Sequence, residues 1–335
     1  MEDERKLYPI RFQPLEDKYS WGSESFLLAD LGYRDSIVRD GWLSANALSE
    51  LMETYLDRLV GERVFDWYGQ QFPFQVKRLK VRGRMPLRVH PDDETARPRY
   101  DALGKEKFWY VTAAGQDACA LAGFGKACDA EEFYLACLEN RPEEWLQRLP
   151  LRKGQWLHIP PGMPHAVLGD AELIEVSESS GLDFWLCGWG EPLSETEFDP
   201  EMSLSDALDF IDFTPADAAS ILGLAKAGRG EELLTLPQFS VRRILLKDKA
   251  ESYALLPDDS CRAYLCLSGS CSVETAPDGV RGCYSLAAGE LLLLPAECSD
   301  YLLIPGERAE LLELRVDRRE EHDPYIMSNG SDARR

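Results

Sequence analysis

The stretch GQWLHIPPGMPH, residues 154–165, carries the pattern that decides the fold. Its glycine opens a short β-rich run, and Pro160 ends that run because proline cannot continue a strand ladder. Pro161 and Gly162 are typical of a tight turn, which directs the side chain of His165 back toward the sheet. A strand, a tight turn and an inward-facing imidazole predict a small β-barrel that can offer a metal ligand.

The same pattern returns in the second half of the chain. Gly289 is followed after five residues by Pro295, and Asp300 stands where the first copy has its histidine. An internal repeat that follows a β-rich run each time predicts two similar barrels. The fold class is therefore all-β with helical insertions: two cupin (jelly-roll type) β-barrels joined by a helical connector. Because the second turn offers only Glu297 and Asp300, we expect a structural barrel without a metal there.

Helical periodicity and turn residues divide the chain further. Insertions with a helical pattern fall at 44–60, beginning with a capping Ser44, and at 129–149. The predicted parts are an N-terminal cupin over 1–195, a helical connector over 196–235, a C-terminal cupin over 236–317 and a mobile tail over 318–335.

Composition excludes several classes of function. The chain has 335 residues with 37 Lys and Arg against 59 Asp and Glu, a net charge of −22, which repels nucleic acid and anionic membranes. No run of about 18 apolar residues could span a membrane, and the charged N-terminus does not resemble a secretory signal. Nine scattered cysteines fit reduced thiols, so we expect a cytoplasmic protein whose partner is a small molecule. The oligomeric state stays open.

Four histidines are present, and two of them fit a metal site. Period-2 alternation in the strand at residues 87–90 places Arg88 and His90 on one face, while His165 comes from the turn described above. Two imidazoles on adjacent strands supply half of a metal site, which needs three or four nitrogen or oxygen ligands. Each can equally be a hydrogen-bonded barrel histidine. His158 and His322 are expected to be incidental.

At this point the sequence resembles the short bacterial class of mannose-6-phosphate isomerases over nearly its whole length. The resemblance rests on WG at 21–22, FPFQVK at 72–77, VHPDD at 89–93, GKEKFWY at 104–110, PPGMPHA at 160–166 and EVSESS at 175–180. It implies a single Zn²⁺ in the first cupin and interconversion of mannose 6-phosphate and fructose 6-phosphate. The metal would polarise the oxygens of the open-chain sugar while a proton moves between C1 and C2.

The resemblance carries over only in part. The family's two metal histidines fall on His90 and His165, and its phosphate-contacting lysine falls on Lys105. Four other positions differ: the metal glutamate falls on Lys107, a glutamine ligand on Arg88, a phosphate-contacting serine on Pro86 and the catalytic arginine on Trp185. Accordingly Lys107 and Trp185 occupy catalytic positions, Arg88 and Lys105 are candidates for substrate binding, and His90, His165 and Glu106 are candidates for the metal.

The substitutions oppose a metal. Arg88 and Lys107 place two positive charges beside a divalent ion, a repulsion of several kcal/mol even at an effective dielectric constant of about 20. Glu106 faces the opposite side of its strand and can replace the lost ligand only through a β-bulge. Alternatively, Arg88 and Lys107 extend outward from the barrel mouth. If both point inward, the ammonium of Lys107 can take the place of Zn²⁺ and bond both histidines.

Three functions remain open. The first is an isomerase-like protein of carbohydrate metabolism with a hexose-phosphate pocket, whose activity is weak or lost. If the activity is lost entirely, the protein would be a non-catalytic sugar-binding sensor or accessory protein. The second is a genuine Zn²⁺-dependent aldose–ketose isomerase, with Glu106 or Glu175 completing the site. The third is a metal-free isomerase that uses Lys107 as a base. Lys107 and Trp185 discriminate between these functions, because an isomerase of the usual Zn²⁺-dependent mechanism tolerates neither residue.

Overall fold

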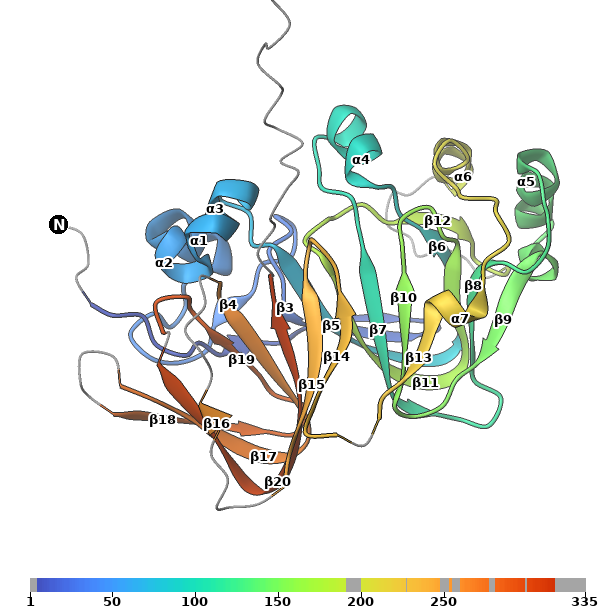
Figure 1. Ribbon diagram of the computed structural model, residues 1–335. Coiled ribbons are helices and arrows are strands. Elements are labelled where there is room, and N and C mark those ends of the chain that lie inside the picture. Colours follow the sequence, from blue (N-terminus) through green and yellow to red (C-terminus); the bar gives the residue numbers. More distant parts are fainter. Residues whose placement is uncertain are drawn as a thin grey trace, which may run out of the picture.

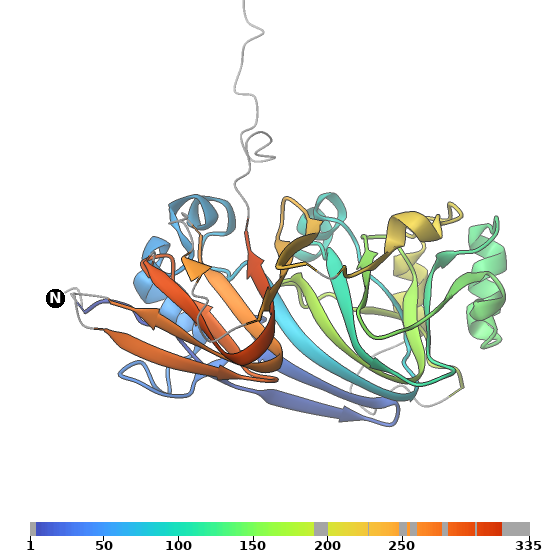
Figure 2. The same cartoon turned by 60° about the horizontal axis from the view of Figure 1, so that its bottom comes forward.

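The computed structural model describes residues 5–190, 200–226, 228–247, 253–254, 260–276, 281–298 and 300–316. Two large antiparallel sheet bodies dominate these residues and lie side by side, with short helices around their ends (Figures 1 and 2). The predicted all-β fold with helical insertions is thus confirmed. None of the helices in the described ranges is long and apolar enough to cross a membrane.

The first body is an 11-stranded sheet built around one long strand. That strand, β11 (His165–Glu178), pairs through its first residues with β6 and β8 and through its later residues with β5 and β7. The other ten strands of the sheet are β2 (Leu15–Tyr19), β3 (Gly22–Leu28), β5 (Phe74–Arg84), β6 (Leu87–Val89), β7 (Lys107–Ala114), β8 (Cys119–Phe124), β9 (Leu146–Pro150), β10 (Gln155–Ile159), β12 (Phe184–Cys187) and β13 (Leu222–Leu224). Consequently β11 brings the ends of several strands to one place.

The second body is a seven-stranded sheet in which β20 pairs with β15, β16 and β17. Its strands are β14 (Gly230–Thr235), β15 (Ser240–Leu246), β16 (Tyr253–Ala254), β17 (Arg262–Thr275), β18 (Gly282–Ala287), β19 (Leu291–Leu294) and β20 (Tyr301–Arg315). All four leucines of β19 are buried, as expected for a strand that fills the interior. A two-stranded ribbon of β1 (Phe12–Gln13) and β4 (Ile37–Val38) accompanies the sheets.

The two copies of the repeat form equivalent turns, but they present different side chains. Gly154 and Gly289 adopt left-handed φ values of 85° and 86° directly before β10 and β19. In the first copy His165 is completely buried. The expectation that Asp300 points into the second barrel is wrong: its side chain is exposed, and its carbonyl accepts from Thr275 Oγ1 at 2.9 Å. A lone carboxylate avoids a barrel interior because burying an unpaired charge is costly.

The helices are shorter than the sequence pattern predicts. They are α1 (Leu48–Tyr55), α2 (Asp57–Val60), α3 (Glu62–Tyr68), α4 (Asp93–Tyr100), α5 (Ala130–Leu138), the 3₁₀ turn η1 (Pro142–Glu144), α6 (Pro200–Ala207) and α7 (Ala218–Ile221). The first insertion begins at Leu48 rather than Ser44, and a left-handed Leu56 (φ 49°) breaks it. The second ends before Pro142, and the residues after η1 form β9 instead of a helix.

The predicted connector over 196–235 is not purely helical. It contains α6 and α7, but the strands β13 and β14 follow and add one edge strand to each sheet body. Leu222 of β13 and Leu233 of β14 pack against the cores of the two sheets, so tertiary packing overrides local propensity here. The division of the chain into domains stays a prediction, and the predicted tail lies outside the described residues.

Candidate functional site

Three strand ends bring His90, His165 and Lys107 together inside the first body. His90 follows β6, His165 opens β11 and Lys107 opens β7. The two imidazole rings lie 5.0 Å apart between centroids, and Lys107 Nζ lies 3.2 Å from His165 Nε2. The predicted convergence of these three side chains is therefore confirmed.

Backbone carbonyls fix the roles of the ring nitrogens. His165 Nδ1 lies 2.9 Å from Met163 O, and His90 Nδ1 lies 3.1 Å from Leu182 O, so each Nδ1 donates a proton. Both Nε2 atoms are then acceptors. Lys107 donates to that of His165, whereas His90 Nε2 is buried and has no hydrogen-bond partner in the described part of the chain. The expectation that Lys107 bonds both histidines holds for one of them.

Lys107 belongs to a buried chain of charges. Its Nζ lies 3.3 Å from Glu175 Oε2, and Lys77 Nζ lies 2.9 Å from Glu175 Oε1. Trp109 Nε1 donates to the same carboxylate at 2.7 Å. Burial alone would raise the pKa of Glu175, but Lys107 and Lys77 hold it well below the usual value. Glu175 is thus an anion committed to two lysines.

Arg88 is the centre of a second buried group. Its Nη1 donates to Glu24 Oε1 at 2.8 Å and to Asp183 Oδ2 at 2.9 Å. The guanidinium lies 4.8 Å from the centroid of the Trp185 ring, so Trp185 covers the Arg88 cation. Arg88 and Lys107 are each 1% exposed, so the alternative in which they extend out of the barrel mouth is wrong.

Lys105 differs from the other buried cations because a backbone carbonyl is its hydrogen-bond partner. Its Nζ donates to Leu182 O at 2.7 Å. Burial lowers the pKa of Lys105 to about 7, with Asp183 opposing and Lys107 adding to the shift. Near neutral pH this side chain therefore exists as both amine and ammonium.

Glu106 does not join the histidines. Its carboxylate lies 2.8 Å from His158 Nε2, on the outer side of neighbouring strands β7 and β10, and both side chains are partly exposed. No bulge occurs in the pairing of residues 107–110 with β10, so alternation directs Glu106 away from the inward-facing Lys107. The structure thus places this predicted metal candidate outside the site.

Sequence reasoning missed Glu24, Lys77 and Asp183. Lys77 shares a strand face with buried Leu79 and Val81, which is a detectable signal because a lysine on an apolar face needs an anionic partner. Glu24 and Asp183 carry no comparable local signal. Their importance comes from pairing with residues far away in the sequence.

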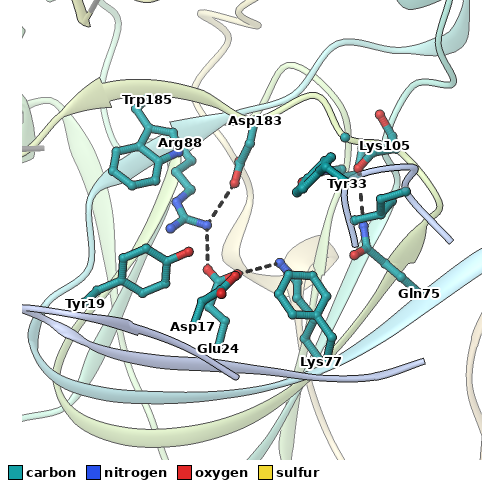
Figure 3. A pocket seen from close by; sticks show the side chains of 14 residues that line it. Asp17, Tyr19, Glu24, Tyr33, Gln75, Lys77, Arg88, Lys105, Asp183 and Trp185 are labelled. Atoms are coloured by element: carbon teal, nitrogen blue, oxygen red, sulfur yellow. Dashed lines mark hydrogen bonds and ion pairs between the residues drawn. The ribbon is translucent and has the colours of Figure 1, made fainter. Parts of the chain in front are cut away.

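A pocket of about 320 Å³ opens beside this charge network (Figure 3). It is lined by Asp17, Tyr19, Glu24, Phe26, Leu31, Tyr33, Gln75, Lys77, Arg88, Lys105, Ser180, Gly181, Asp183 and Trp185. Figure 3 shows Arg88 between Glu24 and Asp183, with Lys77 reaching the same glutamate. His90, His165 and Lys107 do not line the pocket. Asp183 lines the pocket and also contacts the histidine site, since its Oδ1 lies 3.4 Å from His90 Nδ1.

The donor set does not fit Zn²⁺. Among the residues that the structure describes, no three His, Cys, Asp or Glu side chains are grouped so as to hold a metal. Lys107 donates a hydrogen bond to His165 Nε2 and neutralises the Glu175 carboxylate, so neither group is available to a metal. Burial and the Lys107 ammonium lower the pKa of His165 to about 3, and burial and the same ammonium lower the pKa of His90. A cation already resides where a metal would have to bind.

Comparisons with known proteins agree with this architecture. Mannose-6-phosphate isomerase ManA of Bacillus subtilis is 26% identical over 223 residues, covering 61% of this chain and 68% of the relative. The "Probable mannose-6-phosphate isomerase GmuF" of the same organism is 23% identical over 320 residues, covering 88% of this chain and 96% of the relative. No family model matches the chain.

Solved structures give the same result for the fold. The mannose 6-phosphate isomerase from Bacillus subtilis superposes with a TM-score of 0.78 at 19% identity, over 92% of this chain and 99% of the other. A zinc-bound mannose 6-phosphate isomerase superposes with a TM-score of 0.70 at 13% identity, over 91% of this chain and 99% of the other. The chain therefore has the cupin-like fold of phosphomannose isomerases and is homologous to mannose-6-phosphate isomerases at modest identity.

Proposed function

We propose that this chain binds a hexose phosphate in the pocket of its first cupin and has weak or no Zn²⁺-dependent isomerase activity. The observation that carries the proposal is the position of Lys107, whose Nζ donates to His165 Nε2 at 3.2 Å and pairs with Glu175 at 3.3 Å. An ammonium group offers hydrogen-bond donors and no lone pair. It satisfies the buried imidazole but cannot polarise two sugar oxygens as a Lewis acid does.

The pocket itself supports a polar, anionic ligand. Arg88 and Lys77 are neutralised by carboxylates, whereas Lys105 bonds a backbone carbonyl and lies at the pocket wall. An incoming phosphate would pair with Lys105 and favour its charged form. This local cation can override the negative field of the whole chain, because screening limits that field to roughly 8 Å at physiological salt. The volume of about 320 Å³ is at the small end of the range for ligand sites.

A second candidate function is isomerisation without metal. Lys105 favours it more than Lys107 does, because Lys105 lines the pocket and burial lowers its pKa to about 7. An amine with such a pKa can accept a proton from carbon next to a carbonyl. In that case Lys105 would move the proton, and exchange of the C2 proton of mannose 6-phosphate with solvent would depend on it.

Metal analysis and ligand binding test the proposal together. The purified protein should contain far less than one Zn²⁺ per chain and bind mannose 6-phosphate in calorimetry, without zinc-stimulated conversion to fructose 6-phosphate. In Lys107→Glu a carboxylate would join His90, His165 and Glu175, so this variant should gain stoichiometric Zn²⁺. The matched variant Lys107→Gln removes the charge without adding an anion and should not gain it. Stoichiometric zinc with robust zinc-dependent isomerase activity in the unmodified protein would contradict the proposal.

A further inference from the structure

Tyr33 is an unusual residue on the surface of the first body. In the described part of the chain five large apolar side chains are exposed, and Tyr33, at 61%, is the aromatic one. It stands at the tip of the turn formed by residues 31–34 and lines the pocket. A single exposed aromatic ring is ordinary on a protein surface, but this ring lines the pocket, where a ligand can contact it.

The turn that carries Tyr33 is fixed at both ends. Leu31 N donates to Arg34 O at 2.9 Å, and Arg34 clamps the pocket residue Asp17 through two hydrogen bonds of 3.1 and 2.8 Å. Before the turn, Asp30 accepts from Phe72 N at 2.9 Å. The ring is therefore presented by an anchored segment, and little conformational freedom is lost when a ligand packs on it.

Gly181 allows the ring to take its position. A Cβ atom added at Gly181 would lie 3.1 Å from Tyr33 Cε1, which is tighter than an ordinary van der Waals contact. The neighbouring residue Leu182 holds Lys105 through its carbonyl. One short segment thus sets the place of both the aromatic ring and Lys105.

Neighbours cover the other pocket aromatics more closely than they cover Tyr33, whose ring centroid lies 5.7 Å from the Arg34 guanidinium. Tyr19 stacks on Trp21 at 4.9 Å between centroids, Trp185 covers Arg88, and Phe26 is buried. Tyr33 lies across the pocket from Tyr19 and Trp185 (Figure 3). A ligand between these walls meets an aromatic face on one side, while Gln75, Asp183 and Lys105 offer hydrogen-bonding groups.

We propose that Tyr33 is a stacking platform that makes the pocket selective for the closed pyranose ring of a hexose phosphate over its open chain. This inference rests on the proposed function and deepens it. A pyranose has an apolar C–H face that can pack on an aromatic ring, whereas its hydroxyls lie around the edge and reach polar groups. An extended polyol phosphate has the same phosphate and additional hydroxyls but no such face. Ring selectivity also opposes isomerisation, which needs the open-chain sugar.

Calorimetry with two probes tests this selectivity. Methyl α-D-mannopyranoside 6-phosphate is locked as a ring, and D-mannitol 6-phosphate is its open-chain counterpart. The unmodified protein should bind the locked ring at least about tenfold more tightly, equivalent to about 1.4 kcal/mol. Tyr33→Ala should weaken binding of the ring about tenfold and leave that of mannitol phosphate nearly unchanged, whereas Tyr33→Phe keeps the aromatic face and the affinity. Leu224→Ala, at an exposed site outside the pocket, serves as the surface control.

The outcomes distinguish a failure of the proposed role of Tyr33 from a failure of the proposed hexose-phosphate binding. Equal affinity for the two probes, or a locked-ring affinity that survives Tyr33→Ala, would overturn the role of Tyr33 while leaving hexose-phosphate binding in place. If neither probe nor mannose 6-phosphate binds the unmodified protein, the proposed function falls and the inference falls with it.

Discussion

In the site, the buried cations and carboxylates depend on one another for stability. From the sequence, Arg88 and Lys107 are two positive charges where a metal centre needs neutral or negative ligands. In the structure each has a buried carboxylate partner, Glu24 for the arginine and Glu175 for the lysine. Breaking a buried pair by removing one partner typically costs about 3–5 kcal/mol, so these residues form a set that cannot be altered one at a time without loss of stability.

The resemblance to isomerases predicted which side chains converge, but not their partners. His90, His165 and Lys107 were placed correctly because strand alternation and the tight turn determine their direction. Glu24 and Asp183 could not be found in this way. Their ion pairs join strands far apart in the sequence, and no local pattern records such a pairing.

The pH dependence of stability should report on Lys105. Burial lowers its folded-state pKa to about 7, against about 10.4 in an unfolded chain. Between these values the unfolded state binds a proton that the folded state lacks, so the free energy of unfolding should rise as pH increases from 7 to 9. The slope from one such group is at most about 1.4 kcal/mol per pH unit. The pKa of Lys107 is lowered by burial too, which acts in the same direction.

Urea unfolding at pH 7, 8 and 9 measures this effect in the unmodified protein and in Lys105→Met. The methionine variant keeps the apolar stem and removes the titrating group, so its slope should be smaller by up to that amount. Parallel pH profiles for the two proteins would show that Lys105 titrates normally in the folded state.

At the scale of elements, the hairpin of β2 and β3 carries much of the pocket. It supplies Asp17, Tyr19, Glu24 and Phe26 to the lining. Gly22 begins β3 with φ 148°, and a Cβ atom there would lie 1.8 Å from Lys80 O on β5. The hairpin therefore approaches the next strand at a distance that a side chain would prevent.

Gly22→Ala should consequently destabilise the protein by more than about 2 kcal/mol, because the backbone of β3 must move away from β5. Displacing β3 would also disturb Glu24 and weaken binding of mannose 6-phosphate. Gly83→Ala is a matched control on β5, where an added Cβ meets nothing within 4 Å and φ is not left-handed. Thermal unfolding and calorimetry compare the two variants; similar small effects would mean that the close approach at Gly22 is unimportant.

Elements were predicted well where glycine and proline define turns, and less well where they do not. The repeat was found because the spacing of glycine, five residues and proline occurs twice, and both glycines, Gly154 and Gly289, adopt left-handed backbone in the structure. The break at Leu56 was missed, since leucine rarely adopts a positive φ and nothing in its neighbourhood signals one. The strands β9 and β13 were taken as helical because short apolar runs fit either period.

At the scale of the whole molecule, the two sheet bodies share one hydrophobic core. The largest cluster of buried residues contains Phe72 and Phe74 of the first body together with Phe239 and Leu293 of the second. Polar contacts cross the same boundary: Glu310 accepts from Tyr110 OH at 3.1 Å, and Arg78 Nη2 donates to Gly289 O at 2.8 Å. Neither body could bury these surfaces alone, so we expect the described parts of the chain to unfold together.

The positions of the tryptophans make this cooperativity measurable. All eight lie between residues 21 and 189, and none lies in a strand of the second body, whereas far-UV circular dichroism reports on strands of both. In urea the two signals should give one common midpoint, as in a two-state transition.

Leu293→Ala provides the decisive comparison, because the substituted residue lies in β19 of the second body, whose strands carry no tryptophan. Leu293 is fully buried in the shared core, and its backbone exchanges hydrogen bonds of 2.7 and 2.9 Å with Ile10. Truncating a buried leucine costs about 2–5 kcal/mol. If the core is shared, that loss should lower the tryptophan midpoint as much as the circular dichroism midpoint, although no tryptophan lies in the altered body. A fluorescence midpoint that stays in place while the circular dichroism midpoint falls would show instead that the two bodies unfold independently.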